Sequence, residues 1–363
     1  MLASTDRLAR LRDHLVHELR VDSIVITAPS DVRWASNFSG SVASLVVNAE
    51  RLVLIVDSRY GDQARDQSPE CEVIVANSVE ARMKALGETL LGSKRVGFDE
   101  RRTTYAEWRG MHSMVTGELV PLDTPLAELR VHKDVFEVAH IELAARAADK
   151  ALAEVVPRMA GGGMTERNVR DELESCMRKY GAEGAAYPTI VASGPNSALP
   201  HHQPTDRLIR EGDSVIIDVG ALVDGYRSDM TRTFFLGEVD PLLIAFHAIL
   251  VETQRMVMSA VRPGASASEL DALARAGVAD YADDVLHSTG HGVGLDIHEA
   301  PWLRSGSRDV LRAGNVVTVE PGLYRVGVGG VRIEYLLLVE PAGSRTLTNS
   351  PKDPSCLQSA PTT

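Results

Sequence analysis

The chain has 363 residues, of which 44% are hydrophobic and 24% charged, which excludes a disordered protein and is enough for two folded domains. It carries 38 Lys and Arg against 50 Asp and Glu, and its net charge of -12 leaves no basic footprint for a nucleic-acid backbone. Its three cysteines are odd in number and widely spaced, which excludes a disulfide framework and a zinc knuckle.

The opening segment, MLASTDRLARLRDHLVHEL, alternates charged and apolar residues and lacks the apolar core of a signal peptide. No later stretch reads as the ~18 apolar residues that a membrane span needs. We therefore expect a cytoplasmic protein that has neither a nucleic-acid nor a membrane partner.

Residues 1–128 are predicted to form a small α/β domain. Short β-branched runs alternate there with helical stretches, namely DSIVIT, RLVLIVDS, CEVIVAN and RVGFDE. No catalytic motif stands out among these runs, so we expect the chemistry in the second half of the chain.

Residues 129–348 are predicted to form a second domain of helices on a largely antiparallel sheet. Apolar residues recur at steps of three and four from Val138 to Met159, which predicts a long helix that ends at Gly161 to Gly163. Three more helices are expected behind polar caps, at Thr165, at Asp240 with Pro241, and at Ser266 with Glu269. The predicted strands are DSVIIDVG, YRSDMTRTFFL, VVTVE and VRIEYLLLV. Residues 349–363, rich in Pro, Ser and Thr, are expected to form a loose tail.

Two aspartates flank a predicted hairpin between Asp218 and Asp229, in which Asp224-Gly225 is a strong turn signal. The register that this turn sets places Asp218 opposite Thr231. The two aspartates then lie on one face as diagonal neighbours, roughly 7–8 Å apart at the backbone. Converging carboxylates repel unless a proton or a cation intervenes, and the alternative is a solvated strand face. The hairpin alone leaves both interpretations open.

Three histidines, His287, His291 and His298, lie in the glycine-rich segment HSTGHGVGLDIHE. The glycines exclude a regular helix, and the segment lacks the HExxH spacing of zincins. A lone histidine is more often a core or surface residue than a ligand. Three at this density, beside glycines that permit close backbone approach, favour a site.

Glu320 and Glu334 each lie in an otherwise apolar strand, in VVTVE and VRIE. Burying an unpaired carboxylate is costly, so each glutamate requires a partner. The ordinary partner of Glu334 is Arg332 on the same strand face, whereas Glu320 has no cation in its own strand.

These four carboxylates and the histidines form an oxygen-rich set that suits paired divalent ions such as Mn, Co or Fe better than structural zinc. Competing motifs are absent from the sequence. There is no G-x-S-x-G elbow and no P-loop, and the glycines from Gly327 to Gly330 lack the strand-to-helix frame of a dinucleotide site.

Five motifs, in this order, resemble those of the pita-bread metallopeptidases, in the branch of Xaa-Pro aminopeptidases and prolidases: TIVASGPNSALPHH, DVGALVDGYRSDMTRTF, HSTGHGVGLDIHEAP, VTVEPGLY and VRIE. The resemblance covers nearly the whole chain. It implies a creatinase-like N-terminal domain followed by an α+β pita-bread catalytic domain, whose helices lie on a curved, mostly antiparallel sheet. It also implies a homodimer in which the N-terminal domain borders a neighbour's site. Trp34 and Arg59 are candidates for that contact, against ordinary core or surface roles.

By the same resemblance, five residues match the family's metal ligands, namely Asp218, Asp229, His291, Glu320 and Glu334. Asp229 and Glu334 match ligands that bridge two ions, Asp218 matches a ligand of one ion, and His291 and Glu320 match ligands of the other. Two divalent ions per chain are implied, with manganese expected and cobalt, zinc or iron as alternatives. They would activate a bridging water or hydroxide for attack on a peptide carbonyl, with Glu320 relaying its proton.

The resemblance also assigns roles around the metals. His201, His287 and His298 match histidines that contact the substrate and help to protonate the leaving group, and Arg332 matches a residue that orients the substrate or Glu334. The substrates implied are peptides with proline second, cleaved at the N-terminal Xaa-Pro bond.

Three positions depart from the family's pattern. His202 stands where glycine is frequent, Tyr335 where an acidic residue is common, and Trp302 where dipeptide-cleaving members often carry arginine. Arginine would bind a dipeptide's carboxylate bidentately and an indole cannot, although the nearby Arg304 could substitute. This favours an Xaa-Pro aminopeptidase over an Xaa-Pro dipeptidase.

Two further alternatives stay open at this point. One is a hydrolase of non-peptide amides on the same scaffold. The other is a metal-free binding protein or creatinase-like enzyme, against which the complete ligand set argues.

Overall fold

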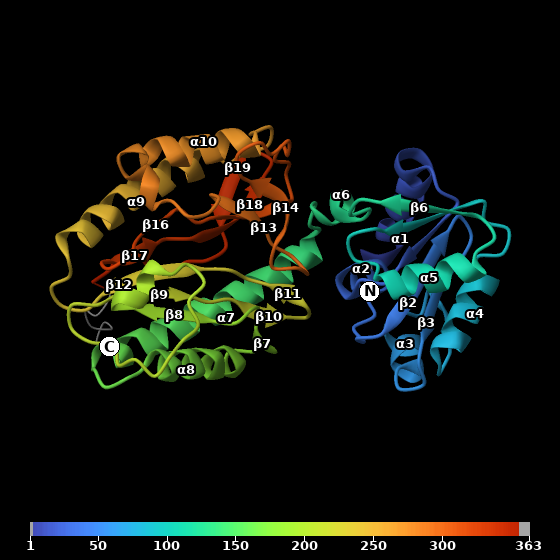
Figure 1. Cartoon of the computed structure of the whole chain (residues 1–363), viewed down its shortest axis with the longest axis horizontal. Helices are drawn as coiled ribbons and strands as arrows, with labels where there is room; N and C mark the ends of the chain where they lie inside the picture. The colour runs from blue at the N-terminus through green and yellow to red at the C-terminus, as the bar shows by residue number, and fades with distance from the viewer. Residues whose placement is uncertain (1–2, 356–363) are drawn as a thin grey trace. The chain divides into compact units, whose positions relative to one another are not determined.

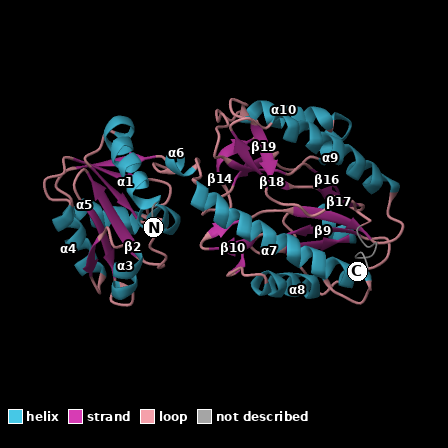
Figure 2. Cartoon of the chain, turned by 180° about the vertical axis from the view of Figure 1, so that it is seen from behind, coloured by secondary structure: helices cyan, strands magenta, loops and turns pink. Residues whose placement is uncertain are grey.

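The computed structural model describes residues 3–355, and the chain divides into two compact units, residues 1–130 and 131–363. Figures 1 and 2 show that each unit has its own sheets and helices. The first is an α/β unit and the second combines helices with antiparallel sheets, as the sequence predicts.

The first unit is built on a six-stranded mixed sheet in the order β4-β3-β2-β1-β5-β6. Its strands are β1 Ser23–Ile26, β2 Ala43–Asn48, β3 Leu52–Val56, β4 Glu72–Val75, β5 Arg95–Asp99 and β6 Glu118–Leu122. The four predicted runs form β1, β3, β4 and β5, whereas β2 and β6 were not predicted. Strand β6 carries Pro121, which is tolerated because β6 lies at the edge of the sheet.

Helices cover this sheet: α1 Ala3–His14, continued by the π-helical turn η1 Leu15–Leu19, α2 Pro29–Ser36, α3 Gly61–Gln67, α4 Val79–Thr89, α5 Tyr105–Met114 and α6 Ala127–Arg130. Helix α5 opens with a capping box between Thr104 and Glu107. Leu86 of α4, Leu90 directly after α4 and Met111 of α5 pack with the strand side chains to form the core of the unit.

The two residues of this unit named as dimer candidates have different surroundings. Trp34 is 2% exposed, and the guanidinium carbon of Arg7 lies 5.7 Å from the centroid of its ring. Arg59 is exposed and forms an ion pair with Asp57 at 2.7 Å. Trp34 therefore belongs to the core of its unit, and Arg59 lies at the surface of the chain.

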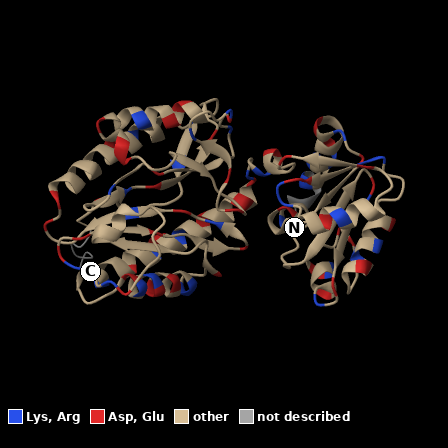
Figure 3. Ribbon diagram, viewed as in Figure 1, with Lys and Arg blue, Asp and Glu red and all other residues tan. Residues whose placement is uncertain are grey.

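Four helices frame the second unit: α7 Val135–Ala160, α8 Glu166–Lys179, α9 Pro241–Ala260 and α10 Ala267–Gly277. They begin at the predicted caps, where the side chains of Thr165, Asp240 and Ser266 accept hydrogen bonds from the first turns of α8, α9 and α10. Helix α7 begins one turn earlier than the apolar pattern indicates, because Asp134 and Glu137 form a capping box. Figure 3 shows basic and acidic residues intermixed along α8, so this helix has no face of one sign.

The strands of the second unit are short: β7 Gly184–Ala185, β8 Ile190–Ser193, β9 Ser214–Asp218, β10 Ala221–Val223, β11 Tyr226–Arg227, β12 Thr231–Phe235, β13 Gly290–Gly292, β14 Glu299–Leu303, β15 Val316–Val319, β16 Gly322–Arg325, β17 Gly329–Arg332, β18 Tyr335–Glu340 and β19 Gly343–Thr346. They form sheets in the orders β11-β10-β7, β12-β9-β8, β14-β13-β15-β18-β19 and β16-β17. Their pairings are antiparallel, as predicted, but they make several small sheets rather than one.

Two pairs of helices cover these sheets (Figure 1). Helices α7 and α8 pack their apolar faces on β8, β9 and β12, whereas α9 and α10 pack on β14, β15 and β18. Each helix pair thus backs a sheet that carries candidate ligands at its strand ends.

By length and composition, α9 is the one helix among residues 3–355 that could cross a membrane. The sequence analysis found no such stretch, because Glu252, Gln254 and Arg255 interrupt the apolar run. The Gln254 side chain is buried and donates to the carbonyls of Val319 and Ile333. These contacts make α9 part of the core of its unit.

The prediction of a loose tail fails for its first residues. The backbone N–H groups of Asn349 and Ser350 donate to the carboxylate of Asp149, and Ser350 carbonyl oxygen accepts from Arg232. The last part of the predicted tail, residues 356–363, lies outside the described residues.

Candidate metal centre

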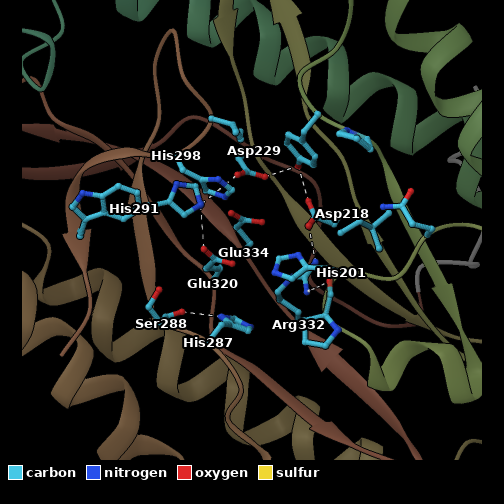
Figure 4. A pocket seen from close by; sticks show the side chains of 17 residues that line it. His201, Asp218, Asp229, His287, Ser288, His291, His298, Glu320, Arg332 and Glu334 are labelled. Atoms are coloured by element: carbon cyan, nitrogen blue, oxygen red, sulfur yellow. Dashed lines mark hydrogen bonds and ion pairs between the residues drawn. The ribbon is translucent and has the colours of Figure 1, made fainter. Parts of the chain in front are cut away.

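A cavity of about 500 Å³ in the second unit gathers all nine residues that the sequence analysis named as ligands or catalytic groups (Figure 4). They are His201, Asp218, Asp229, His287, His291, His298, Glu320, Arg332 and Glu334. The cavity thus draws on all five motifs quoted from the sequence.

The aspartates are placed by the hairpin that follows β9. Asp224 and Gly225 have φ angles of 49° and 76°, which identifies the left-handed turn expected of an Asp-Gly pair. Asp218 pairs with Thr231 across β9 and β12, which confirms the predicted register. Asp218 ends β9 and Asp229 lies just before β12, so both carboxylates reach the cavity from one face.

The glutamates also lie where strands stop. Glu320 follows β15 directly, and Glu334 lies in the two-residue gap between β17 and β18. Thr231 connects Glu334 to the aspartate hairpin: its carbonyl accepts from Glu334 N at 3.1 Å, and its hydroxyl donates to Glu334 Oε2 at 2.8 Å. A side chain at a strand end is free to turn out of the sheet plane, which lets four carboxylates meet.

His291 is held on β13 between two glycines that allow close backbone contact. A Cβ atom on Gly290 would lie 2.1 Å from Thr318 carbonyl oxygen, and one on Gly292 would lie 2.1 Å from Ala300 carbonyl oxygen. Both positions therefore require glycine. The backbone packs closely on both sides of His291 and fixes where its ring enters the cavity.

Three of the five predicted ligands form a close inner group. One ligand atom each from Asp229, His291 and Glu334 lies within 4.8 Å of the others. Glu320 adjoins this group, since its Oε1 lies 3.3 Å from His291 Nε2. Asp218 is connected to it through Tyr187, whose hydroxyl lies 2.5 Å from Oδ1 of Asp218 and 2.5 Å from Oδ1 of Asp229.

Arg332 does not pair with Glu334, the ordinary partner considered from the sequence. Its Nη2 donates to Asp218 Oδ2 at 2.6 Å, its Nη1 to the Tyr324 hydroxyl at 2.8 Å, and its Nε to Thr231 Oγ1 at 3.0 Å. The Arg332 residue is 3% exposed, so these bonds fix the orientation of its guanidinium.

The two carboxylates of the inner group are buried close to other acidic groups. Burial, together with the charge of Asp218, raises the pKa of Asp229 well above its ordinary value, and burial with the charge of Asp229 does the same to the pKa of Glu334. Glu334 Oε1 is buried and has no hydrogen-bond partner among residues 3–355. A divalent cation would neutralise this pair and bind the free oxygen.

Glu320 and His291 behave as an ion pair. Burial opposes ionisation of Glu320, but the hydrogen bond and charge of His291, together with the charges of His287 and Arg332, outweigh burial and hold the pKa of Glu320 at about 2. Burial lowers the pKa of His291, and the same contact with Glu320 raises it overall. The centre therefore combines ionised and protonated side chains, and metal binding would release the protons.

Three further histidines surround the inner group. The ring of His298 lies 4.4 Å from the ring of His291, and His287 is hydrogen-bonded to the Tyr324 hydroxyl at 2.8 Å. Burial lowers the pKa of both His287 and His298, so both are neutral near pH 7. His201 reaches the cavity from the segment before β9.

Residues 139–341 match metallopeptidase family M24, and residues 7–132 match the creatinase/prolidase N-terminal domain. The chain belongs to metallopeptidase family M24. It is a metal-dependent peptidase, and the predicted family and fold are confirmed. The buried inner group and its free carboxylate oxygen fit the divalent metal use of an M24 peptidase.

Relatives of this M24 peptidase bear two kinds of name. The uncharacterized peptidase YqhT of Bacillus subtilis is 37% identical over 96% of this chain and 99% of its own length. The structure of an Xaa-Pro dipeptidase from Bacillus anthracis has a TM-score of 0.93 and 34% identity, and the match covers 97% of this chain and 99% of that one. The X-Pro aminopeptidase of Thermotoga maritima MSB8 has a TM-score of 0.87 and 32% identity, with 95% and 98% covered. Dipeptidases and aminopeptidases match this M24 chain about equally well. The two activities therefore have to be distinguished by individual residues of the site.

Sequence reasoning missed two tyrosines of the M24 centre. Tyr187 contacts both aspartates, and Tyr324 links Arg332 to His287. Tyr324 is the last residue of the quoted motif VTVEPGLY, so the sequence could have identified it as a site residue. Nothing in the local sequence around Tyr187 indicates that it belongs to the site. Burial raises the pKa of Tyr324 to about 12, so its hydroxyl keeps its proton.

Proposed function

We propose that this M24 peptidase is an Xaa-Pro aminopeptidase with two divalent ions, held by Asp218, Asp229, His291, Glu320 and Glu334. The observation that supports the site most directly is the inner group of Asp229, His291 and Glu334, whose ligand atoms lie within 4.8 Å of one another. Asp229 and Glu334 are proposed as the shared ligands, because both are buried beside other carboxylates: Asp218 raises the pKa of Asp229, and Asp229 raises the pKa of Glu334. Bound ions supply Lewis acidity and lower the pKa of a nucleophilic water.

Manganese is the ion we propose, with cobalt, zinc or iron as alternatives. Four carboxylates and one imidazole form a hard, oxygen-rich donor set, which suits manganese better than a thiolate site would. The ligands lie on or directly beside separate strands that other contacts already hold in place, such as the hydrogen bond of Thr231 to Glu334.

The other residues of the cavity would act on the substrate. His298 is neutral near pH 7, so it can donate a ring N–H to the developing oxyanion or the leaving nitrogen. His287 donates from Nδ1 to the Ser288 carbonyl and accepts from the Tyr324 hydroxyl at Nε2, so it would act by holding Tyr324 in the cavity wall. Glu320, which stays ionised, would accept a proton from the nucleophilic water. Arg332, fixed by Asp218 and Tyr324, and His201, at the cavity wall, would orient the peptide.

Substrates with proline in the second position are proposed from the names of the relatives, which include Xaa-Pro dipeptidases and X-Pro aminopeptidases. Trp302 lines the cavity, and its uncharged indole favours peptides that continue beyond proline. One observation favours the second candidate, an Xaa-Pro dipeptidase. The guanidinium carbon of Arg304 lies 5.3 Å from the Trp302 ring, so a cation is close enough to attract a dipeptide's carboxylate.

Matched peptides test this choice. Protein freed of metal is assayed with Mn, Co or Zn on an Xaa-Pro dipeptide, the same sequence extended by one residue, and both peptides with alanine replacing proline. We expect the Xaa-Pro tripeptide with Mn to be cleaved fastest and the alanine peptides to be poor substrates. Faster cleavage of the dipeptide would identify a dipeptidase. Hydrolysis of no peptide with any ion would contradict the proposal, and a panel of non-peptide amides would follow.

A homodimer is proposed from the family resemblance, and a cytoplasmic location from the three widely spaced cysteines, which suit a reducing compartment. Light scattering of the purified chain tests the first, and a monomer at all concentrations would contradict it. Fractionation of the source cells tests the second.

A further inference from the structure

Arg232 is a buried guanidinium directly behind the metal centre. It lies on β12 and is 1% exposed, and it makes no ion pair with any Asp or Glu of residues 3–355. Its hydrogen bonds go instead to backbone carbonyls: Nη2 donates to Ser350 at 2.6 Å, Nε to Ser350 and Pro351 at 2.9 and 3.1 Å, and Nη1 to Thr231 and Glu334. A buried cation without a carboxylate depends on such oxygens, because each unsatisfied N–H would be costly.

The carbonyls of Ser350 and Pro351 belong to the segment 349–353, here called the C-terminal strap. The strap is fixed on its other side by Asp149 of α7, whose carboxylate accepts from the N–H of Asn349, the N–H of Ser350 and the Ser350 hydroxyl. Asp149 thus orients the Ser350 peptide, and the carbonyl of that residue receives Arg232. Arg232 in turn donates to the carbonyl of Glu334, a proposed shared ligand.

A second chain of contacts runs from the strap to both glutamates. Lys352 Nζ donates to Gln254 Oε1 at 3.2 Å, and Lys352 carbonyl oxygen accepts from His247. The amide nitrogen of Gln254 donates to the carbonyls of Val319 and Ile333, at 3.0 and 2.8 Å. These two residues directly precede Glu320 and Glu334, so the strap is connected to the backbone at both ligands.

We propose that the C-terminal strap is a positioning element of the metal centre, which holds the backbone at Glu334 and Glu320 through Arg232 and Gln254. The proposal rests on the proposed function, since the ions are what these glutamates would bind. Groups that fix metal ligands from behind typically change metal affinity about 10- to 100-fold when they are removed.

Two truncations separate the strap from the residues beyond it. The shorter chain ends at Thr348, and the matched control ends at Ser355 and keeps the strap. We measure Mn²⁺ affinity by calorimetry and the unfolding midpoint of the metal-free proteins. The chain ending at Thr348 should bind Mn²⁺ about 10- to 100-fold more weakly than the control. Equal affinities in the two chains would overturn the proposal, even if the unfolding midpoint falls.

Tyr335 offers a rescue of the shorter chain. Its ring centroid lies 4.2 Å from the guanidinium carbon of Arg232, so a carboxylate at this position would be within reach of an ion pair. The substitution Tyr335→Asp in the chain ending at Thr348 should recover at least about tenfold in Mn²⁺ affinity. The substitution Tyr335→Asn, of the same size but uncharged, should recover less. Equal recovery by both substitutions would mean that an ion pair with Arg232 does not restore Mn²⁺ affinity.

Point variants keep the test decisive if the shorter chain does not fold. Asp149→Ala in the full chain releases the strap from α7 and should weaken Mn²⁺ binding several-fold, whereas Asp171→Ala, which removes an exposed carboxylate from α8, should not. Equal affinities of these two variants would overturn the strap proposal. Failure of the unchanged chain to bind Mn²⁺, Co²⁺ or Zn²⁺ would instead contradict the proposed metal site.

Discussion

Arg332 donates a hydrogen bond to Asp218 at 2.6 Å, although Glu334 is only two residues away in the chain. The two residues would share a face of a continuous strand, but β17 ends at Arg332 and β18 begins after Glu334. This break turns the glutamate towards Asp229 and leaves its Oε1 without a partner in the described chain. The centre therefore keeps two neighbouring buried carboxylates, and the charge of Asp229 raises the pKa of Glu334.

The first prediction concerns Glu334→Gln, which removes one charge from this pair. Turnover should fall at least about 100-fold, because the ions supply several kcal/mol of transition-state stabilisation and Glu334 is a proposed shared ligand. The metal-free variant should nevertheless unfold at a higher temperature than the metal-free parent at about pH 8, by roughly 2–4 °C per kcal/mol of relieved repulsion.

Scanning calorimetry of both metal-free proteins measures this gain. Glu340→Gln, at a half-buried position of β18 paired with Arg345, is the matched control and should change little. A variant that keeps parental turnover would show that Glu334 is not a ligand.

The second prediction is a pH dependence of metal binding. A carboxyl group with a raised folded pKa stabilises the fold while protonated, and this contribution disappears as the pH rises through the folded value. The pKa values of Asp229 and Glu334 are raised, whereas Glu320, with a pKa of about 2, stays ionised above about pH 4. Because the ions need ionised ligands, Mn²⁺ affinity should rise from about pH 6 to about pH 8 and binding should release protons.

Calorimetric titrations in two buffers of different ionisation enthalpy count the released protons. Affinity that does not change over this range, with no proton release, would mean that the two carboxylates are already ionised without metal.

The third prediction separates His298 from the ligands. His298→Gln should lower turnover about 10²- to 10⁴-fold, the range for a general acid or base, while metal content stays near that of the parent. His112→Gln, on α5 of the first unit, serves as the control and should leave both unchanged. Parallel loss of metal and activity in the His298 variant would make this residue a ligand instead.

The fourth prediction addresses peptide length. Trp302→Arg places a guanidinium at the cavity wall, where it can bind the free carboxylate of a dipeptide bidentately. The ratio of kcat/KM for the Xaa-Pro dipeptide to that for the tripeptide should rise at least about tenfold, equivalent to ~1.4 kcal/mol. Trp302→Phe keeps an uncharged ring and should leave this ratio near its original value. An unchanged ratio in the arginine variant would exclude this position from control of length.

Helix caps and the hairpin turn were predictable because they depend on neighbours in the chain. Thr165, Asp240 and Ser266 open helices through their own first turns, and Asp224-Gly225 sets the register of Asp218 opposite Thr231. The division of the second unit into several sheets was not predictable in this way. It depends on strand breaks, such as the one at Glu334, that long-range contacts impose.

The nine candidate residues lie in one cavity. They could be identified from the sequence because each of the five quoted motifs contains at least one of them. Their partners were harder to predict. Tyr187 reaches Asp218 and Asp229 across 31 and 42 residues, and Arg332 reaches Asp218 across 114. Such pairings follow from the packing of the sheets and have no signal in the local sequence. The strap was predicted to be loose for the same reason, since a Pro- and Ser-rich composition does not show that Arg232 requires its carbonyls.

Gly290 and Gly292 are expected to tolerate substitution as poorly as His291, but for a different reason. Gly290 and Gly292 touch no ligand through a side chain, yet any larger residue would strike the neighbouring strands. A library of variants should therefore show a run of three sensitive positions, of which only the middle one can be rescued by excess metal. Measuring the activity of each variant with and without added manganese would distinguish steric clashes from the loss of a metal ligand. No structure of any variant would be needed.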